Sequence, residues 1–294
     1  QKIYLGNHHL MDTTAVAFAK ALKNQTALVS LDLTRNLITH VGLETISNAL
    51  PHLPLLKRVE FDHNPKLTDM ATESFAHFLS SPKISSFKAS NCGLNNIAPL
   101  APLFAPLKIL SLSSNMIGDT GFHDLAESAS HYTRLYSLQL EDVGLTHVGC
   151  KHVAKILQSC TNLVEIHLSH NQKIGGDGAV VIMEAVSNCM LLMRVELEDC
   201  GIDWTQDQLV QVVEYLKSGS NQLLSKLALK NNPFQPLDWT PLDDLRTVKP
   251  NVRVYLEDDP FGRSNVGGEA GKKTDDDTTM PRRNSLVLAK KHRS

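Results

Sequence analysis

The sequence lacks long apolar runs, paired cysteine motifs and a strong net charge. No run of about 18 apolar residues, the length that a membrane-spanning helix needs, occurs, so no transmembrane segment is expected. The formal net charge of −2 argues against a nucleic-acid partner. The five cysteines are odd in number and form no CxxC pair. We therefore expect buried, reduced thiols and a cytoplasmic or nuclear protein.

What the sequence does contain is an apolar pattern, LxxLxLxxNxL, that recurs about every 28 residues. Its first strand position falls at residues 3, 31, 59, 87, 110, 138, 166, 195, 227 and 254, in steps of 28, 28, 28, 23, 28, 28, 29, 32 and 27. Self-similarity at such a period predicts a solenoid, in which each unit buries its apolar face against its neighbours.

This pattern resembles the leucine-rich-repeat family, within its long-repeat, ribonuclease-inhibitor-like class, over roughly residues 1–258. The resemblance implies an α/β fold of about nine to ten repeats: a right-handed solenoid, or horseshoe, with a parallel sheet on the concave side and helices on the convex side. It says little about function, because the class contains inhibitors, immune sensors, scaffolds and GTPase activators.

The residues support this fold independently. In each LxL the two apolar side chains should point inward and the middle residue outward. An amide that bonds the adjacent turn should follow, at Asn36, Asn64, Asn115, Asn171 and Asn232, with Cys92, Cys200, Val143 and His8 as replacements.

Two further local patterns concern the helical half of the repeat. Glycines four residues after the last apolar position suit a tight start of the helix, at Gly42, Gly121, Gly149 and Gly178. The short repeat 87–109 contains Pro99, Pro102 and Pro106, which predict 3₁₀ or extended turns instead of a full α-helix.

The domain organisation predicted is a repeat domain over 1–259 followed by a disordered basic tail over 260–294. Residues 261–294 contain eight Lys or Arg and four Asp or Glu, a net +4. Because the chain starts at Gln1 inside a repeat, we expect that an N-terminal cap is missing and that the chain belongs to a longer one. Within the tail, Arg282-Arg283-Asn284-Ser285-Leu286 resembles a basophilic kinase substrate, which predicts phosphorylation of Ser285.

The candidate binding surface consists of the outward-facing strand positions, which the resemblance places on the concave face. Acidic residues concentrate there and favour a protein partner with a basic surface; the alternative is an ordinary solvated surface. The predicted partner-binding residues are Asp32, Glu60, Asp62, Gln139, Glu141, Asp142, His167, Glu196, Glu198, Asp199, Tyr255 and Glu257.

Enzyme-like signals are weak. His167 and His170 could approach Glu196 or Asp199, but they lie in different strand columns and should diverge, so no metal site is expected. The glycine-rich stretch 267–274 has the wrong spacing for a phosphate-binding loop. We therefore expect no cofactor and no catalytic residues.

The function predicted is a non-enzymatic protein-interaction module, a scaffold or regulatory subunit, present as a monomer or as part of a larger chain. One alternative is a GTPase-activating protein resembling the Ran activator, for which only Arg35 occupies a suitable edge position. Another is the ligand-sensing segment of a larger multidomain receptor or actin regulator.

Overall fold

The computed structural model describes residues 1–256, which form one open parallel sheet of ten strands in the order β1 to β10. Each strand has three residues and belongs to one repeat. The strands are β1 (Lys2–Tyr4), β2 (Ser30–Asp32), β3 (Arg58–Glu60), β4 (Ser86–Lys88), β5 (Ile109–Ser111), β6 (Ser137–Gln139), β7 (Glu165–His167), β8 (Arg194–Glu196), β9 (Lys226–Ala228) and β10 (Arg253–Tyr255).

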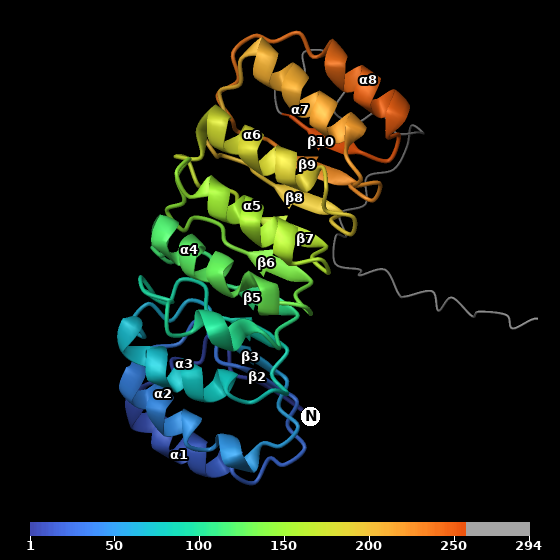
Figure 1. The fold of residues 1–294 in the computed structure, drawn as a ribbon. Helices are drawn as coiled ribbons and strands as arrows, with labels where there is room; N and C mark the ends of the chain where they lie inside the picture. The colour runs from blue at the N-terminus through green and yellow to red at the C-terminus, as the bar shows by residue number, and fades with distance from the viewer. Residues whose placement is uncertain (257–294) are drawn as a thin grey trace, which may run out of the picture.

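Helices return the chain from each strand to the next and line the outer side of an arc, with the sheet on its inner side (Figure 1). The α-helices are α1 (Asp12–Leu22), α2 (His40–Ser47), α3 (Thr72–Leu79), α4 (Gly118–Ser128), α5 (Cys150–Ser159), α6 (Gly175–Val186), α7 (Gln206–Ser218) and α8 (Thr240–Val248). Short 3₁₀ turns are η1 (Leu50–His52), η2 (Asp69–Ala71), η3 (Ala101–Phe104) and η4 (Ala129–His131). Within residues 1–256, no helix has the length and hydropathy to cross a membrane.

The strand register confirms the predicted repeat. Ile3 pairs with Leu31, and Leu31 pairs with Val59. The same register continues through Leu227 and Val254. Leu31 and Leu33 are completely buried, whereas Asp32 between them is partly exposed. The leucine-rich-repeat solenoid is therefore the fold of this chain.

The short repeat also behaves as its prolines predict, because only the 3₁₀ turn η3 forms between β4 and β5. Aromatic rings fill the core beside this missing helix, and five buried phenylalanines contact one another at centroid distances of 5.2–6.2 Å. They are Phe61, Phe75, Phe78, Phe87 and Phe104. Bulky rings here replace the apolar volume that a helix supplies in other repeats.

The buried asparagines each serve two repeats. Asn115 donates from Nδ2 to the carbonyls of Leu112 in its own repeat and Ala89 in the preceding one, both at 2.8 Å. Its Oδ1 accepts the backbone N–H groups of Cys92 and Leu94, both at 3.0 Å. The preceding repeat therefore needs no asparagine of its own.

Because each asparagine also bonds the preceding repeat, that repeat can carry another residue at the asparagine position. His8, Cys92, Val143 and Cys200 each come one repeat before an asparagine whose Oδ1 accepts their backbone N–H. The two cysteines also keep one donor function of the amide. The Sγ of Cys92 donates to the carbonyl of Phe61 at 3.2 Å, and that of Cys200 donates to Leu168 at 3.3 Å.

The recurrent glycines lie at the helix starts, as predicted. At Gly42 and Gly149, however, the reason is close contact with a neighbouring repeat and not the conformational freedom of glycine. Gly42 and Gly149 have ordinary negative φ, so their backbone does not require glycine. A Cβ at Gly149 would lie 2.3 Å from Oδ1 of Asp119, and one at Gly42 would lie 2.3 Å from Oδ1 of Asp12. Both carboxylates bond the start of the next helical segment, at Thr146 and Thr39 respectively. Close packing between repeats selects glycine there.

Candidate functional site

Two residues of every strand face the concave side, one on each side of the buried central residue. In β7, Glu165 and His167 flank the buried Ile166. Of these two positions, only the second is represented among the predicted binding residues. The first position, which the two-residue period of a strand indicates, was missed. It carries a basic side chain on five of the ten strands, three of them the neighbouring strands β8–β10: Lys2, Arg58, Arg194, Lys226 and Arg253.

His167 lies at the centre of the concave face among three carboxylates. Its Nδ1 is 2.8 Å from Oε2 of Glu196 and 3.7 Å from Oε1 of Glu141, and its Nε2 is 3.9 Å from Oε2 of Glu165. Burial alone would lower the pKa of His167, but its interactions with these three carboxylates raise it to about 11. The imidazole therefore carries a positive charge at neutral pH.

Glu196 is already engaged by two cations. Its Oε1 accepts a hydrogen bond from Nζ of Lys226 at 2.9 Å, and Oε2 contacts His167. The hydrogen bond from His167 is the largest influence on the pKa of Glu196, and with that from Lys226 it lowers the pKa to about 2 against the opposing effect of burial. Glu196 therefore belongs to an internal ion network.

The residue before each asparagine position has a left-handed backbone. Its φ lies between 50° and 62° in nine repeats, at Asn7, Arg35, His63, Asn91, Ser114, Asp142, His170, Asp199 and Asn231. This conformation favours asparagine and aspartate. Asp142 and Asp199 thus have a structural reason for their identity in addition to any role in binding.

His170 belongs to a separate cluster from His167, as their different columns predict. Its Nδ1 lies 3.1 Å from Oδ2 of Asp199, which also accepts from the side chain of Gln172. These hydrogen bonds, first that from His170, lower the pKa of Asp199. The two histidines therefore do not share one set of carboxylates.

Acidic side chains gather around an open hollow at the carboxyl-terminal edge of β6–β8. Its volume is about 630 Å³. Glu141, Asp142 and Asp199 line it together with His170 and Lys173. Within residues 1–256, the side chains of Asp142 and Glu198 form no hydrogen bond or ion pair. Neither carboxylate is therefore engaged by another side chain of the described part of the chain through a hydrogen bond or ion pair.

The predicted acids of the first repeats lie apart from this hollow and act locally. Asp32 accepts from the backbone of Thr34 at 2.9 Å, and Asp62 accepts from that of Ser90 at 2.7 Å. Glu60 lies 3.8 Å from Nζ of Lys88. The predicted acidic surface therefore divides into two groups. Serines at 90, 111, 113 and 114 separate them.

The remaining predicted residues have mixed placements. Gln139 is partly exposed at the end of β6, beside His167 in the strand register. The ring of Tyr255 lies under Nζ of Lys226, which is 5.7 Å from its centroid. Glu257 and Ser285 lie outside the described residues.

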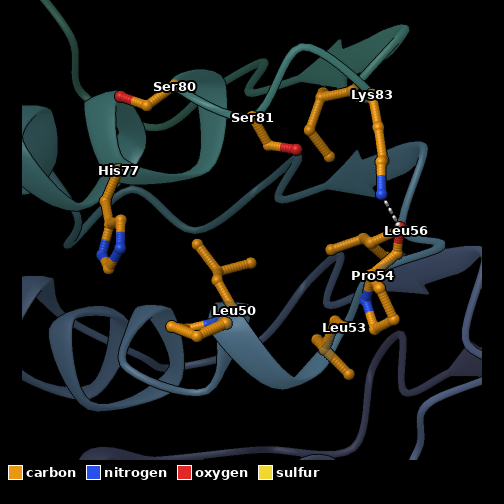
Figure 2. A pocket seen from close by; sticks show the side chains of 10 residues that line it. Leu50, Leu53, Pro54, Leu56, His77, Ser80, Ser81 and Lys83 are labelled. Carbon is orange, nitrogen blue, oxygen red and sulfur yellow. Dashed lines mark hydrogen bonds between the residues drawn. The ribbon is translucent and has the colours of Figure 1, made fainter.

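Two apolar hollows occur on the opposite edge, between helix ends and the following strands. One, of about 300 Å³, is lined mainly by Leu50, Leu53, Pro54 and Leu56, and Lys83 closes one side by donating to the carbonyl of Pro54 at 2.8 Å (Figure 2). The other, of about 330 Å³, lies between α5 and α6 and is lined by Leu157, Cys160, Cys189 and Met190 among others. Neither brings together carboxylates or histidines for chemistry.

Comparisons with known proteins agree with this geometry. A family model described as "Leucine Rich repeat" matches residues 105–125 and 159–183. The chain is 28% identical to human NACHT, LRR and PYD domains-containing protein 12 over 79% of its own length and 20% of that protein. It is 29% identical to mouse ribonuclease inhibitor over 56% of its length and 38% of that protein.

Among solved structures, an internalin from Listeria monocytogenes covers 80% of this chain and 75% of its own, with 16% identity and a TM-score of 0.47. These matches are to leucine-rich-repeat proteins, including the ribonuclease inhibitor itself, and agree with the leucine-rich-repeat solenoid of the structure. The chain spans about a fifth to two fifths of the relatives named here.

Proposed function

We propose that this chain is a non-enzymatic protein-binding module, a scaffold or regulatory subunit, whose partner docks on the concave face over β6–β8. The observation that carries this proposal is the hollow of about 630 Å³ lined in part by Asp142. Within residues 1–256, neither the carboxylate of Asp142 nor that of the partly exposed Glu198 forms a hydrogen bond or ion pair. A partner that presents basic side chains to this edge would satisfy them. The leucine-rich-repeat fold, typical of protein-interaction modules, supports the same reading.

Basic residues at the amino-terminal ends of β8–β10, on the same concave face, restrict that partner further. Arg194, Lys226 and Arg253 lie in direct register on β8, β9 and β10. Because the carboxyl-terminal edge is acidic and the amino-terminal edge is basic, the face favours a partner with basic groups over one edge and acidic groups over the other. Such complementarity fixes orientation as well as affinity.

The test uses two double variants with the same change in net charge. Asp142→Asn with Glu198→Gln removes the two available concave carboxylates, and Glu44→Gln with Glu184→Gln removes two exposed carboxylates from the convex helices α2 and α6. Partners captured from cell extract by each tagged chain are quantified by mass spectrometry at low and high salt. We expect the concave variant to lose partners that the convex variant keeps, and equal retention would contradict the proposal.

A second candidate is the ligand-sensing segment of a larger protein. The similarity to human NACHT, LRR and PYD domains-containing protein 12 favours this candidate, because the chain matches only 20% of that much longer protein. The full-length transcript tests it: an upstream nucleotide-binding domain is the expected result, and a reading frame that encodes repeats alone would contradict it.

We also propose a cytoplasmic or nuclear compartment and a regulatory role for the tail, 260–294. The five cysteines are free thiols, which supports a reducing compartment. The tail carries Ser285 in its basic motif, and phosphate there would weaken any contact between the tail and the acidic edge. Deleting 261–294 should raise partner affinity, and unchanged affinity and salt dependence would contradict the tail's role.

A further inference from the structure

Glu141, His167 and Glu196 bring three metal-ligand atoms together on the concave face. The atoms Oε1 of Glu141, Nδ1 of His167 and one carboxylate oxygen of Glu196 lie within 4.8 Å of one another. The Nδ1–oxygen distances are 3.7 Å to Glu141 and 2.8 Å to Glu196. Ligands at about 2.0–2.1 Å from a tetrahedral Zn²⁺ are about 3.3 Å apart, so the two distances bracket the required spacing.

Groups behind the cluster would orient two of these ligands. Lys226 bonds Oε1 of Glu196 at 2.9 Å and thereby leaves Oε2 directed at Nδ1 of His167. On the other side of the imidazole, Nε2 is buried without a hydrogen-bond partner, and Oε2 of Glu165 lies 3.9 Å away. A metal-bound histidine usually donates its second N–H to such a carboxylate.

The unpartnered Nε2 is the observation that separates this cluster from an ordinary group of surface acids. An ion at Nδ1 would fix the proton on Nε2, and a small movement of Glu165 would then complete the hydrogen bond. The three ligands also come from neighbouring repeats, just beyond β6, on β7 and on β8, whose register holds Gln139, His167 and Glu196 side by side. Strands position ligands more rigidly than loops do.

We propose that Glu141, His167 and Glu196 form a binding site for one divalent transition-metal ion of the Zn²⁺ type. The ion takes the place of the proton on Nδ1 of His167, which is released to solvent, and the two carboxylates supply the other protein ligands. A fourth coordination position faces the open concave side, where water or a side chain of the partner can bind. This site goes beyond the proposed protein-binding function and does not depend on it.

The test is a titration of the full chain with Co²⁺ and Zn²⁺ under reducing conditions. The visible absorption of bound Co²⁺ reports coordination number, and calorimetry with Zn²⁺ gives stoichiometry and affinity. We expect one ion per chain at micromolar or lower dissociation constant. The Co²⁺ spectrum should have the intensity of a four- or five-coordinate site and lack a thiolate charge-transfer band, which would instead reveal binding to one of the five cysteines.

Variants distinguish this site from the other histidines, of which the chain has 13 in all. Glu141→Gln should weaken binding at least ten-fold, and Glu165→Gln should weaken it less. His170→Gln is the matched control, because His170 also contacts a carboxylate on the same face but lies outside the cluster. Circular dichroism confirms that each variant is folded. Absence of saturable one-to-one binding by the wild type, or equal loss in Glu141→Gln and His170→Gln, would overturn the proposal.

Discussion

At the scale of single residues, the asparagine position shows how one buried amide stabilises two repeats. Asn171 donates to the carbonyls of Leu168 and Leu140 and accepts from the backbone of Val143 and Leu145. A buried backbone group that loses its partner costs about 1–3 kcal/mol. Such an amide therefore contributes more to the free energy of unfolding than the residue at the same position one repeat earlier, which is Val143 before Asn171 and Cys92 before Asn115.

This reasoning predicts unequal costs at neighbouring positions. Asn115→Ala should lower the free energy of unfolding by more than about 3 kcal/mol, because two carbonyls and two N–H groups lose their partner. Cys92→Ala should cost about half as much or less, since one weak Sγ donor and a small volume are lost. Urea unfolding measures both, and equal costs would contradict the role assigned to the amide.

Charged residues on the concave face also differ from one another more than the sequence indicates. Glu196 and Glu198 both occupy outward-facing positions of the pattern, yet Glu196 bonds His167 and Lys226, whereas the side chain of Glu198 forms no hydrogen bond or ion pair within residues 1–256. Both residues were predicted to bind a partner. Contacts between neighbouring repeats decide the difference, and the sequence of one repeat does not contain them.

Glu196→Gln should therefore destabilise the fold by about 1–3 kcal/mol, because His167 and Lys226 lose a charged hydrogen-bond partner. Glu198→Gln, at an open position, should change stability by no more than about 0.5 kcal/mol. Thermal unfolding of the two variants at neutral pH provides the comparison. If both variants unfold at the same temperature as the wild type, the ion network does not contribute to stability.

At the scale of elements, the apolar pattern determines the strands and the asparagines determine the turns. The strand register could be predicted because Leu31, Val59 and their equivalents must all point into one core. The prolines of repeat 87–109 likewise predict the 3₁₀ turn η3. The reason for the helix-start glycines could not be predicted, because it depends on Asp12 and Asp119 from the preceding repeat.

Turn glycines offer a test that separates backbone strain from steric contact. Gly118 and Gly201 both have positive φ, of 57° and 64°. A Cβ at Gly118 meets nothing within 4 Å, whereas one at Gly201 would lie 2.2 Å from the carbonyl oxygen of Gln172. Gly118→Ala should cost about 1–2 kcal/mol from left-handed strain. Gly201→Ala should cost clearly more in denaturant unfolding, and equal costs would show that the turn can move away from Gln172.

At the scale of the whole molecule, an open parallel sheet presents ten neighbouring strands to a partner on one continuous concave face (Figure 1). Its helices bury the other side and leave exposed charges such as Glu44 and Glu184. The fold was predictable to the register of each strand. The proposed binding face was predictable only as a set of columns, because ion pairs between repeats engage some of its acids, such as Glu196, and leave others, such as Glu198, unpaired within residues 1–256.

The measurement that tests the central claim most directly is site-specific photo-crosslinking. A benzophenone amino acid at Ser114, which lines the concave hollow, is compared with one at Glu184 on the convex helix α6. Both positions are exposed. We expect a partner to be crosslinked from position 114 and not from position 184. Crosslinking from 184 alone would place the binding surface on the helices and contradict it.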